Sequence, residues 1–101
     1  MIKILVEKKE DRIVFVEVKG HANSAECGKD LVCAAVSGVV QGTITNIQND
    51  NDFDYVVDEG YFSIRDKGNS TSHDQIVLET LVSSLNYLAE NNTKFIKIKN
   101  N

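Results

Sequence analysis

The stretch Ile13-Val14-Phe15-Val16-Glu17-Val18-Lys19 decides how the chain begins to fold. It is rich in β-branched residues, which prefer the extended backbone of a strand. The residues before it alternate in character, with Ile2, Ile4 and Val6 on one side of a second strand. Because a polar segment, Lys8 to Arg12, separates the two stretches, we predict that they form a β-hairpin.

Two longer stretches repeat apolar residues with the spacing of an amphipathic helix. The first begins at Asp30, a good N-cap residue, and runs to about Asn46. Its many Val residues and its glycines disfavour a helix, so burial must stabilise it. The second begins at the capping box Ser72-x-x-Gln75 and stops at Asn91-Asn92. The apolar positions that should face the core are Val32, Val36, Val39, Val40, Thr43 and Ile47 in the first helix and Val77, Leu78, Leu81, Val82, Leu85 and Leu88 in the second.

The remaining segments complete the order ββαββαβ. A second hairpin is predicted from Phe53–Val57 and Tyr61–Arg65 around Asp58-Glu59-Gly60, a last strand from Lys94–Lys99, and loops at Gly20–Lys29, Asn49–Asp54 and Lys67–Thr71. Two helices with one apolar stripe each can cover one face of a sheet. The predicted fold class is therefore α+β, in two layers, with a mixed, mostly antiparallel sheet and both helices on one face. We expect residues 1–101 to form a single domain.

Composition limits the classes of function. The chain has 101 residues, with 11 Lys and Arg against 15 Asp and Glu and a net charge of −4. This balance argues against a nucleic-acid binder, which needs cations to meet phosphates. No apolar run approaches the ~20 residues of a membrane span, and the N-terminus does not resemble a signal peptide. We therefore expect a cytoplasmic protein without a membrane partner, in which Cys27 and Cys33 are reduced thiols.

Candidate chemistry lies where a histidine follows a strand and a cysteine begins a helix. His21 stands at the end of the predicted strand Ile13–Lys19, and Cys33 lies three residues after Asp30, in the first turn of the predicted helix. First-turn amides lack intrahelical acceptors and the helix end is partially positive, so a thiol there ionises more readily. His21 could take the thiol proton and later give it to a leaving amine, while the same amides hold an oxyanion. His21 and Cys33 are thus a candidate catalytic dyad.

Simpler roles stay open for the same residues. A cysteine in a helix is often buried filler, and a histidine in a loop is often solvated. A zinc site could use His21, Cys27 and Cys33, with His73 as a further ligand, but the spacing lacks the paired cysteines of structural zinc sites. A disulfide between Cys27 and Cys33 is disfavoured in a reducing compartment.

Three polar neighbours each have two interpretations. Asp30 caps the helix or orients His21. Ser37 lies four residues after Cys33, on the same helix face, and either hydrogen-bonds near the site or packs as a small residue. Asn23 is either a partner that orients the histidine or a turn former.

The run Gly20-His21-Ala22, followed by Asp30-Leu31-Val32-Cys33-Ala34-Ala35-Val36-Ser37, resembles the Prp family of ribosomal-processing cysteine proteases. The resemblance covers the whole chain. It implies a cytosolic endopeptidase that removes the N-terminal extension of large-subunit ribosomal protein 27, cutting after a hydrophobic motif that contains Phe. The implied partner is therefore the extension peptide of that protein.

The resemblance also implies roles for individual residues. His21 would be the general base and acid, Cys33 the nucleophile, and Asp30, Ser37 and Gly20 supporting residues, with a mobile loop between Gly20 and Asp30 that admits the peptide. It implies a homodimer, no cofactor and no metal. Cys27 is not part of the matching motif.

A function of a different class stays open. The same α+β frame could serve as a non-enzymatic, ribosome-associated binding module. Such a module needs a basic or aromatic surface, and the chain offers scattered lysines, densest at Lys94, Lys97 and Lys99. A steep loss of RNA binding with salt would favour this alternative.

Overall fold

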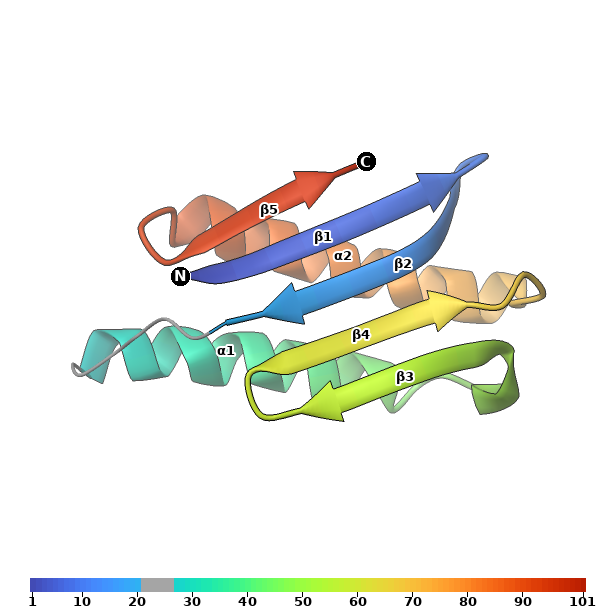
Figure 1. Cartoon of the computed structure of the whole chain (residues 1–101), viewed down its shortest axis with the longest axis horizontal. Helices are drawn as coiled ribbons and strands as arrows, with labels where there is room; N and C mark the ends of the chain where they lie inside the picture. Colours follow the sequence, from blue (N-terminus) through green and yellow to red (C-terminus); the bar gives the residue numbers. More distant parts are fainter. Residues whose placement is uncertain (21–26) are drawn as a thin grey trace.

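The computed structural model describes residues 1–20 and 27–101, with the side chains of 1–20 and 31–101. Its elements are β1 (Ile2–Lys9), β2 (Arg12–Lys19), α1 (Cys27–Ile44), a short 3-10 helix η1 (Asp50–Asp52), β3 (Phe53–Asp58), β4 (Tyr61–Asp66), α2 (Ser72–Asn91) and β5 (Ile96–Asn100). The predicted order ββαββαβ and the α+β class are confirmed. Both helices lie on one face of the sheet, behind it in Figure 1. In the part of the chain that the structure describes, no helix is long and apolar enough to cross a bilayer.

The sheet has five strands in the order β3-β4-β2-β1-β5. β1 pairs with β5 in parallel, and the other three pairings are antiparallel. The predicted first hairpin is present, and it turns through Glu10 and Asp11, whose φ angles are 52° and 65°. Asp is one of the residues that tolerates this left-handed region, which two-residue hairpin turns of the primed types require.

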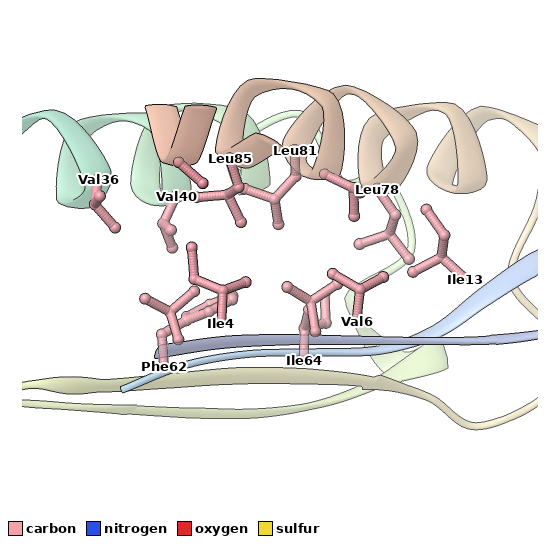
Figure 2. Close-up of a cluster of buried hydrophobic side chains, with 14 of the residues drawn as sticks. Ile4, Val6, Ile13, Val36, Val40, Phe62, Ile64, Leu78, Leu81 and Leu85 are labelled. Atoms are coloured by element: carbon pink, nitrogen blue, oxygen red, sulfur yellow. The ribbon is translucent and has the colours of Figure 1, made fainter. Parts of the chain in front are cut away.

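The core fills the space between the helices and the sheet. Figure 2 shows Val36, Val40, Leu78, Leu81 and Leu85 of the helices directed toward Ile4, Val6, Phe62 and Ile64 of the sheet. Ile2, Ile4 and Val6 are all buried, as their alternation predicts. The helical stripes are also confirmed, with Val39 and Leu88 at the half-buried margin of the core. Ile47 is buried as predicted, but it lies after the end of α1 and not in the helix.

Helix α1 begins one turn earlier than predicted. It starts at Cys27 and not at Asp30, and it ends at Ile44. No residue of this turn prevents helix formation, since the chain contains no proline. The buried stripe of Val32, Val36 and Val40 fixes the helix, and the turn before it continues the same hydrogen-bonding pattern.

Helix α2 is capped one residue earlier than the predicted capping box. Thr71 is the N-cap, and its side chain accepts a hydrogen bond from the Asp74 amide at 3.2 Å. Gln75 instead reaches across to β2, where its Oε1 accepts from the Ile13 amide at 2.9 Å and its Nε2 donates to the Ile13 carbonyl at 2.8 Å. The buried glutamine therefore ties the helix to the sheet and does not cap the helix end.

Candidate active site

A pocket of about 230 Å³ lies between α1 and the end of the sheet at which β2 stops and β4 starts. Its walls come from β1, β2, the β3–β4 turn and one face of α1. The lining residues are Ile2, Val18, Gly20, Cys33, Val36, Ser37, Val40, Gln41, Ile44, Val57, Asp58, Gly60, Tyr61 and Phe62. Most of these are apolar, so the pocket suits an apolar side chain of a ligand, with polar groups at its margin.

Cys33 faces this pocket from the second turn of α1. It is half-buried and also packs against the hydrophobic core. As the seventh residue of the helix, it does not stand in the first turn, so that prediction is wrong. Only the first four amides of a helix lack intrahelical acceptors, and the effect of the helix dipole fades within a turn. The Cys33 amide is therefore not one of the donors available for an oxyanion.

Gly20, the residue before the predicted histidine, lines the same pocket. Its φ angle is +98°, and its amide donates to the Gly60 carbonyl at 2.9 Å. A Cβ at this position would lie 2.5 Å from the carbonyl oxygen of Met1. Only glycine combines this backbone angle with so close an approach.

Ser37 and Gln41 continue the face of α1 that carries Cys33. Both line the pocket, and the Gln41 side-chain amide lies 3.3 Å from the Ser37 hydroxyl, to which it donates. Residues four apart share a helix face, so 33, 37 and 41 form a row. Of these two residues only Ser37 was predicted from the sequence, although the same spacing of four also points to Gln41.

Tyr61 and Asp58 add polar groups from the β3–β4 hairpin, and neither was predicted to belong to the site. The Tyr61 hydroxyl donates to Glu17 Oε2 at 2.7 Å, and this hydrogen bond raises the pKa of the tyrosine. The hydroxyl therefore stays protonated at neutral pH. Asp58 Oδ1 accepts the amide hydrogen of Glu59 at 2.7 Å, within the turn. The hairpin reaches the site only through tertiary packing, so no local sequence signal marks it.

The structure brings together three of the predicted site residues: Gly20, Cys33 and Ser37. His21 and Asn23 lie outside the described residues, as do the side chains of Asp30 and Cys27. His73 lies elsewhere, with its Nε2 3.1 Å from the carbonyl oxygen of Asn46. Among the side chains that the structure describes, those of residues 1–20 and 31–101, no group of three His, Cys, Asp or Glu could hold a metal ion.

The fold and the pocket place the chain among small two-layer α+β proteins with a cysteine at a helix-lined pocket. A model of the family described as cysteine protease Prp matches residues 1–97. The ribosomal processing cysteine protease Prp of Staphylococcus aureus is 30% identical over 93 residues, covering 88% of each chain. The protein of that name from Bacillus subtilis is 44% identical over 48 residues, covering 46% of this chain and 43% of its own. The chain belongs to the Prp family of cysteine proteases, which confirms the predicted resemblance and, with it, a cysteine peptidase.

Solved structures agree with this assignment. The S. aureus protease with a covalently linked product peptide has a TM-score of 0.87 and 27% identity, over 100% of both chains. The same protease with a substrate peptide has a TM-score of 0.80 and 26% identity, again over 100% of both chains. A Streptococcus mutans protein has a TM-score of 0.81 and 29% identity, covering 99% of this chain and 93% of its own.

Proposed function

We propose that this chain is an endopeptidase that removes the N-terminal extension of large-subunit ribosomal protein 27, with Cys33 as nucleophile and His21 as general base and acid. The observation that carries the proposal is the position of Cys33 in the pocket between α1 and the sheet, in a chain of the cysteine protease family. Gly20, the residue before His21, lines the same pocket. The peptide complexes of the S. aureus relative support a peptide as the ligand.

The proposed reaction has two halves. His21 takes the proton of the Cys33 thiol, and the sulfur attacks the carbonyl carbon of the scissile bond. The C–N bond then breaks, and the amine leaves with the proton from His21, so that a thioester remains on Cys33. A water molecule gives a proton to His21 and attacks the thioester, which releases the carboxylic acid and restores the thiol.

Supporting roles follow from the pocket. Its apolar walls would hold the Phe-containing motif that precedes the cut. Gly20 would fix the direction in which the chain leaves β2 toward His21. Ser37, held by Gln41, would provide a hydroxyl beside the reacting groups, and Asp30 is proposed as a further supporting residue.

The test is cleavage of a synthetic peptide that spans the extension and the start of the mature ribosomal protein, followed by mass spectrometry. Replacing the nucleophile in Cys33→Ala, or the base in His21→Ala, should lower kcat/KM by about a thousandfold or more. Cys27→Ser is the matched control and should retain activity. A folded Cys33→Ala variant that still cuts the peptide would remove the proposal.

Three further points belong to this proposal. We propose that residues 1–101 act as one domain, that the enzyme works in the cytoplasm, and that it forms a homodimer. The dimer is tested by sedimentation of the purified chain. If RNA binding is tight and falls steeply with salt while no peptide is cut, the alternative binding module is correct.

A further inference from the structure

We propose that the outer edge of β3 binds the extended backbone of a basic peptide as an added strand. This inference rests on the proposed function, because the peptide is the part of the substrate that continues beyond the pocket. β3 is the last strand of the sheet, at its lower edge in Figure 1, and no described strand pairs with its outer side. Val56 and Val57 on this edge are 50% and 65% exposed. An open, apolar strand edge is a template for another strand.

The hairpin register shows which backbone groups the edge offers. The backbone amide of Lys67 donates to the carbonyl of Asp52 at 2.9 Å, so these two residues form a hydrogen-bonded pair that continues the antiparallel ladder. Hydrogen-bonded pairs alternate along the ladder, so the backbone N–H and C=O groups of Asp54, which is paired with Arg65, bond to β4. The backbone groups of Val56 do the same. Tyr55 and Val57 therefore direct their N–H and C=O groups toward the outer side. These two residues can hold a short peptide strand through main-chain hydrogen bonds.

Charge on the edge selects the side chains of the added strand. Residues 50–59 contain Asp50, Asp52, Asp54, Asp58 and Glu59 and no Lys or Arg. Asp54 and Asp58 alternate with Phe53, Tyr55 and Val57 in β3 and so lie on the face of the strand away from the helices, where Asp54 Oδ1 is 3.6 Å from the exposed Lys67 Nζ. Lysine or arginine at every second residue of the peptide would meet these carboxylates, with apolar residues between them.

The edge continues directly into the candidate active site. Val57 and Asp58, at the end of β3, line the pocket that also contains Cys33. A peptide whose apolar residue enters the pocket can therefore pass along β3 without leaving the surface. The opposite edge differs, because β5 exposes Lys97 and Lys99, which disfavour pairing with another strand and repel a basic peptide. Of the two sheet edges, the one at the pocket is the one that suits this ligand.

The first experiment uses peptides with backbone N-methyl groups. The extension peptide, lengthened with alternating Lys residues on one or the other side of the cut, is N-methylated at one residue at a time. Methyl groups at alternate positions should raise KM by about fivefold or more, because only every second N–H faces β3. A uniform tolerance of methylation along the lengthened segment would overturn the proposal.

The second experiment changes the protein. Val56→Lys places a positive charge on the edge, and Ile76→Lys, at a 60% exposed position on α2, is the matched control with the same charge change. Val56→Lys should raise KM for the lysine peptide by about fivefold, with less effect when glutamine replaces those lysines. Equal effects of the two variants would overturn the proposal. If Val56→Lys instead separates a dimer without changing KM, the edge pairs two copies and the proposal is wrong.

Peptide binding to the Cys33→Ala variant, measured by fluorescence anisotropy, separates this inference from the proposed function. Binding with the alternating N-methyl pattern supports the edge site even if the wild-type chain cuts no peptide. Cleavage by the wild-type chain without that pattern keeps the protease and removes the edge site.

Discussion

Gly20 holds a backbone conformation that an L-amino acid rarely adopts, and it does so where the chain leaves β2 for the candidate site. We predict that Gly20→Ala lowers the free energy of unfolding by about 1–3 kcal/mol, because φ is +98° and the new Cβ would meet the Met1 carbonyl oxygen at 2.5 Å. Urea denaturation monitored by circular dichroism gives this value.

The matched control is Gly42→Ala, in the interior of α1. A Cβ there has no neighbour within 4 Å, so the change should stabilise the chain by up to about 1 kcal/mol through helix propensity. If both substitutions change the free energy of unfolding in the same direction, the strain assigned to Gly20 is not present.

Asp66 provides a prediction about pH. Its side chain is 1% exposed, and burial alone would raise its pKa. Hydrogen bonds from the Ser70 hydroxyl and from the Gly68 and Ser70 amides, with Arg12 nearby, outweigh burial and hold the pKa below its usual value. A lowered folded-state pKa adds stability above the unfolded pKa of about 4, and that stability is lost as the pH falls further.

We therefore expect Asp66→Asn to lower the free energy of unfolding at pH 7 by about 1–3 kcal/mol. As the pH falls from about 5 to about 3, through the unfolded pKa, the variant should also lose less stability than the wild type. Urea titrations across this range measure both effects. An acid loss as steep in Asp66→Asn as in the wild type would contradict the role of this carboxylate.

Sequence reasoning found part of the site at this scale. It identified Cys33 from its place near the start of a predicted helix and Ser37 from its spacing of four residues from Cys33, and the motif match singled out Gly20. The φ angle of Gly20 and its contact with Met1 depend on two strands meeting, so neither can be read from local sequence. Tyr61 and Asp58 come from a distant hairpin, and only the tertiary structure brings them to the pocket.

At the scale of elements, the strands were predicted well and the helix ends less well. Alternation locates a strand because one face is buried, and β1 shows this pattern clearly. In β2 a shift of the pairing register interrupts the alternation between Ile13 and Val16. Helix ends depend on single capping residues that compete with one another. Asp30 has the chemistry of an N-cap but lies inside α1, and Thr71 caps α2 in place of Ser72.

Asp74 fixes the start of α2 against the segment that follows α1. Its carboxylate is fully buried and accepts the amide hydrogens of Gln48 at 2.9 Å and Asn49 at 3.1 Å. We predict that Asp74→Asn lowers the free energy of unfolding by about 1–3 kcal/mol, because the new amide can accept only one of these hydrogens. Thermal and urea unfolding check the value.

The same isosteric change at Glu79, exposed on the same helix, is the control and should change stability by less than about 0.5 kcal/mol. Equal effects at the two positions would mean that the buried carboxylate does not hold the connection between the helices.

For the whole molecule, the two-layer class follows from the number of apolar stripes, but the strand order does not. β5 joins the sheet beside β1 and in parallel with it, across nearly the whole chain length. That placement leaves β3 at the other edge, next to the pocket. Hairpins are local and can be predicted from turns, whereas the pairing of first and last strands depends on the complete core.

The single core between the layers gives a prediction at this scale. Leu85 is 0% exposed and faces the sheet from α2, as Figure 2 shows, while Tyr87 on the same helix is 66% exposed. Leu85→Ala should cost about 2–5 kcal/mol because it leaves a cavity, and Tyr87→Ala should cost less than about 0.5 kcal/mol. A loss below about 1 kcal/mol for Leu85→Ala would show that the layers repack without it.

The amino end of the chain lies at the pocket. Ile2 is one of its walls, and the Met1 carbonyl oxygen lies against Gly20. The carboxyl end is held far from it along β1, where the Asn101 amide donates to the Val6 carbonyl at 2.8 Å (Figure 1). An affinity tag fused before Met1 would therefore start beside the pocket and compete with a peptide for the space there. Purification handles, fluorophores and surface anchors therefore belong after Asn101.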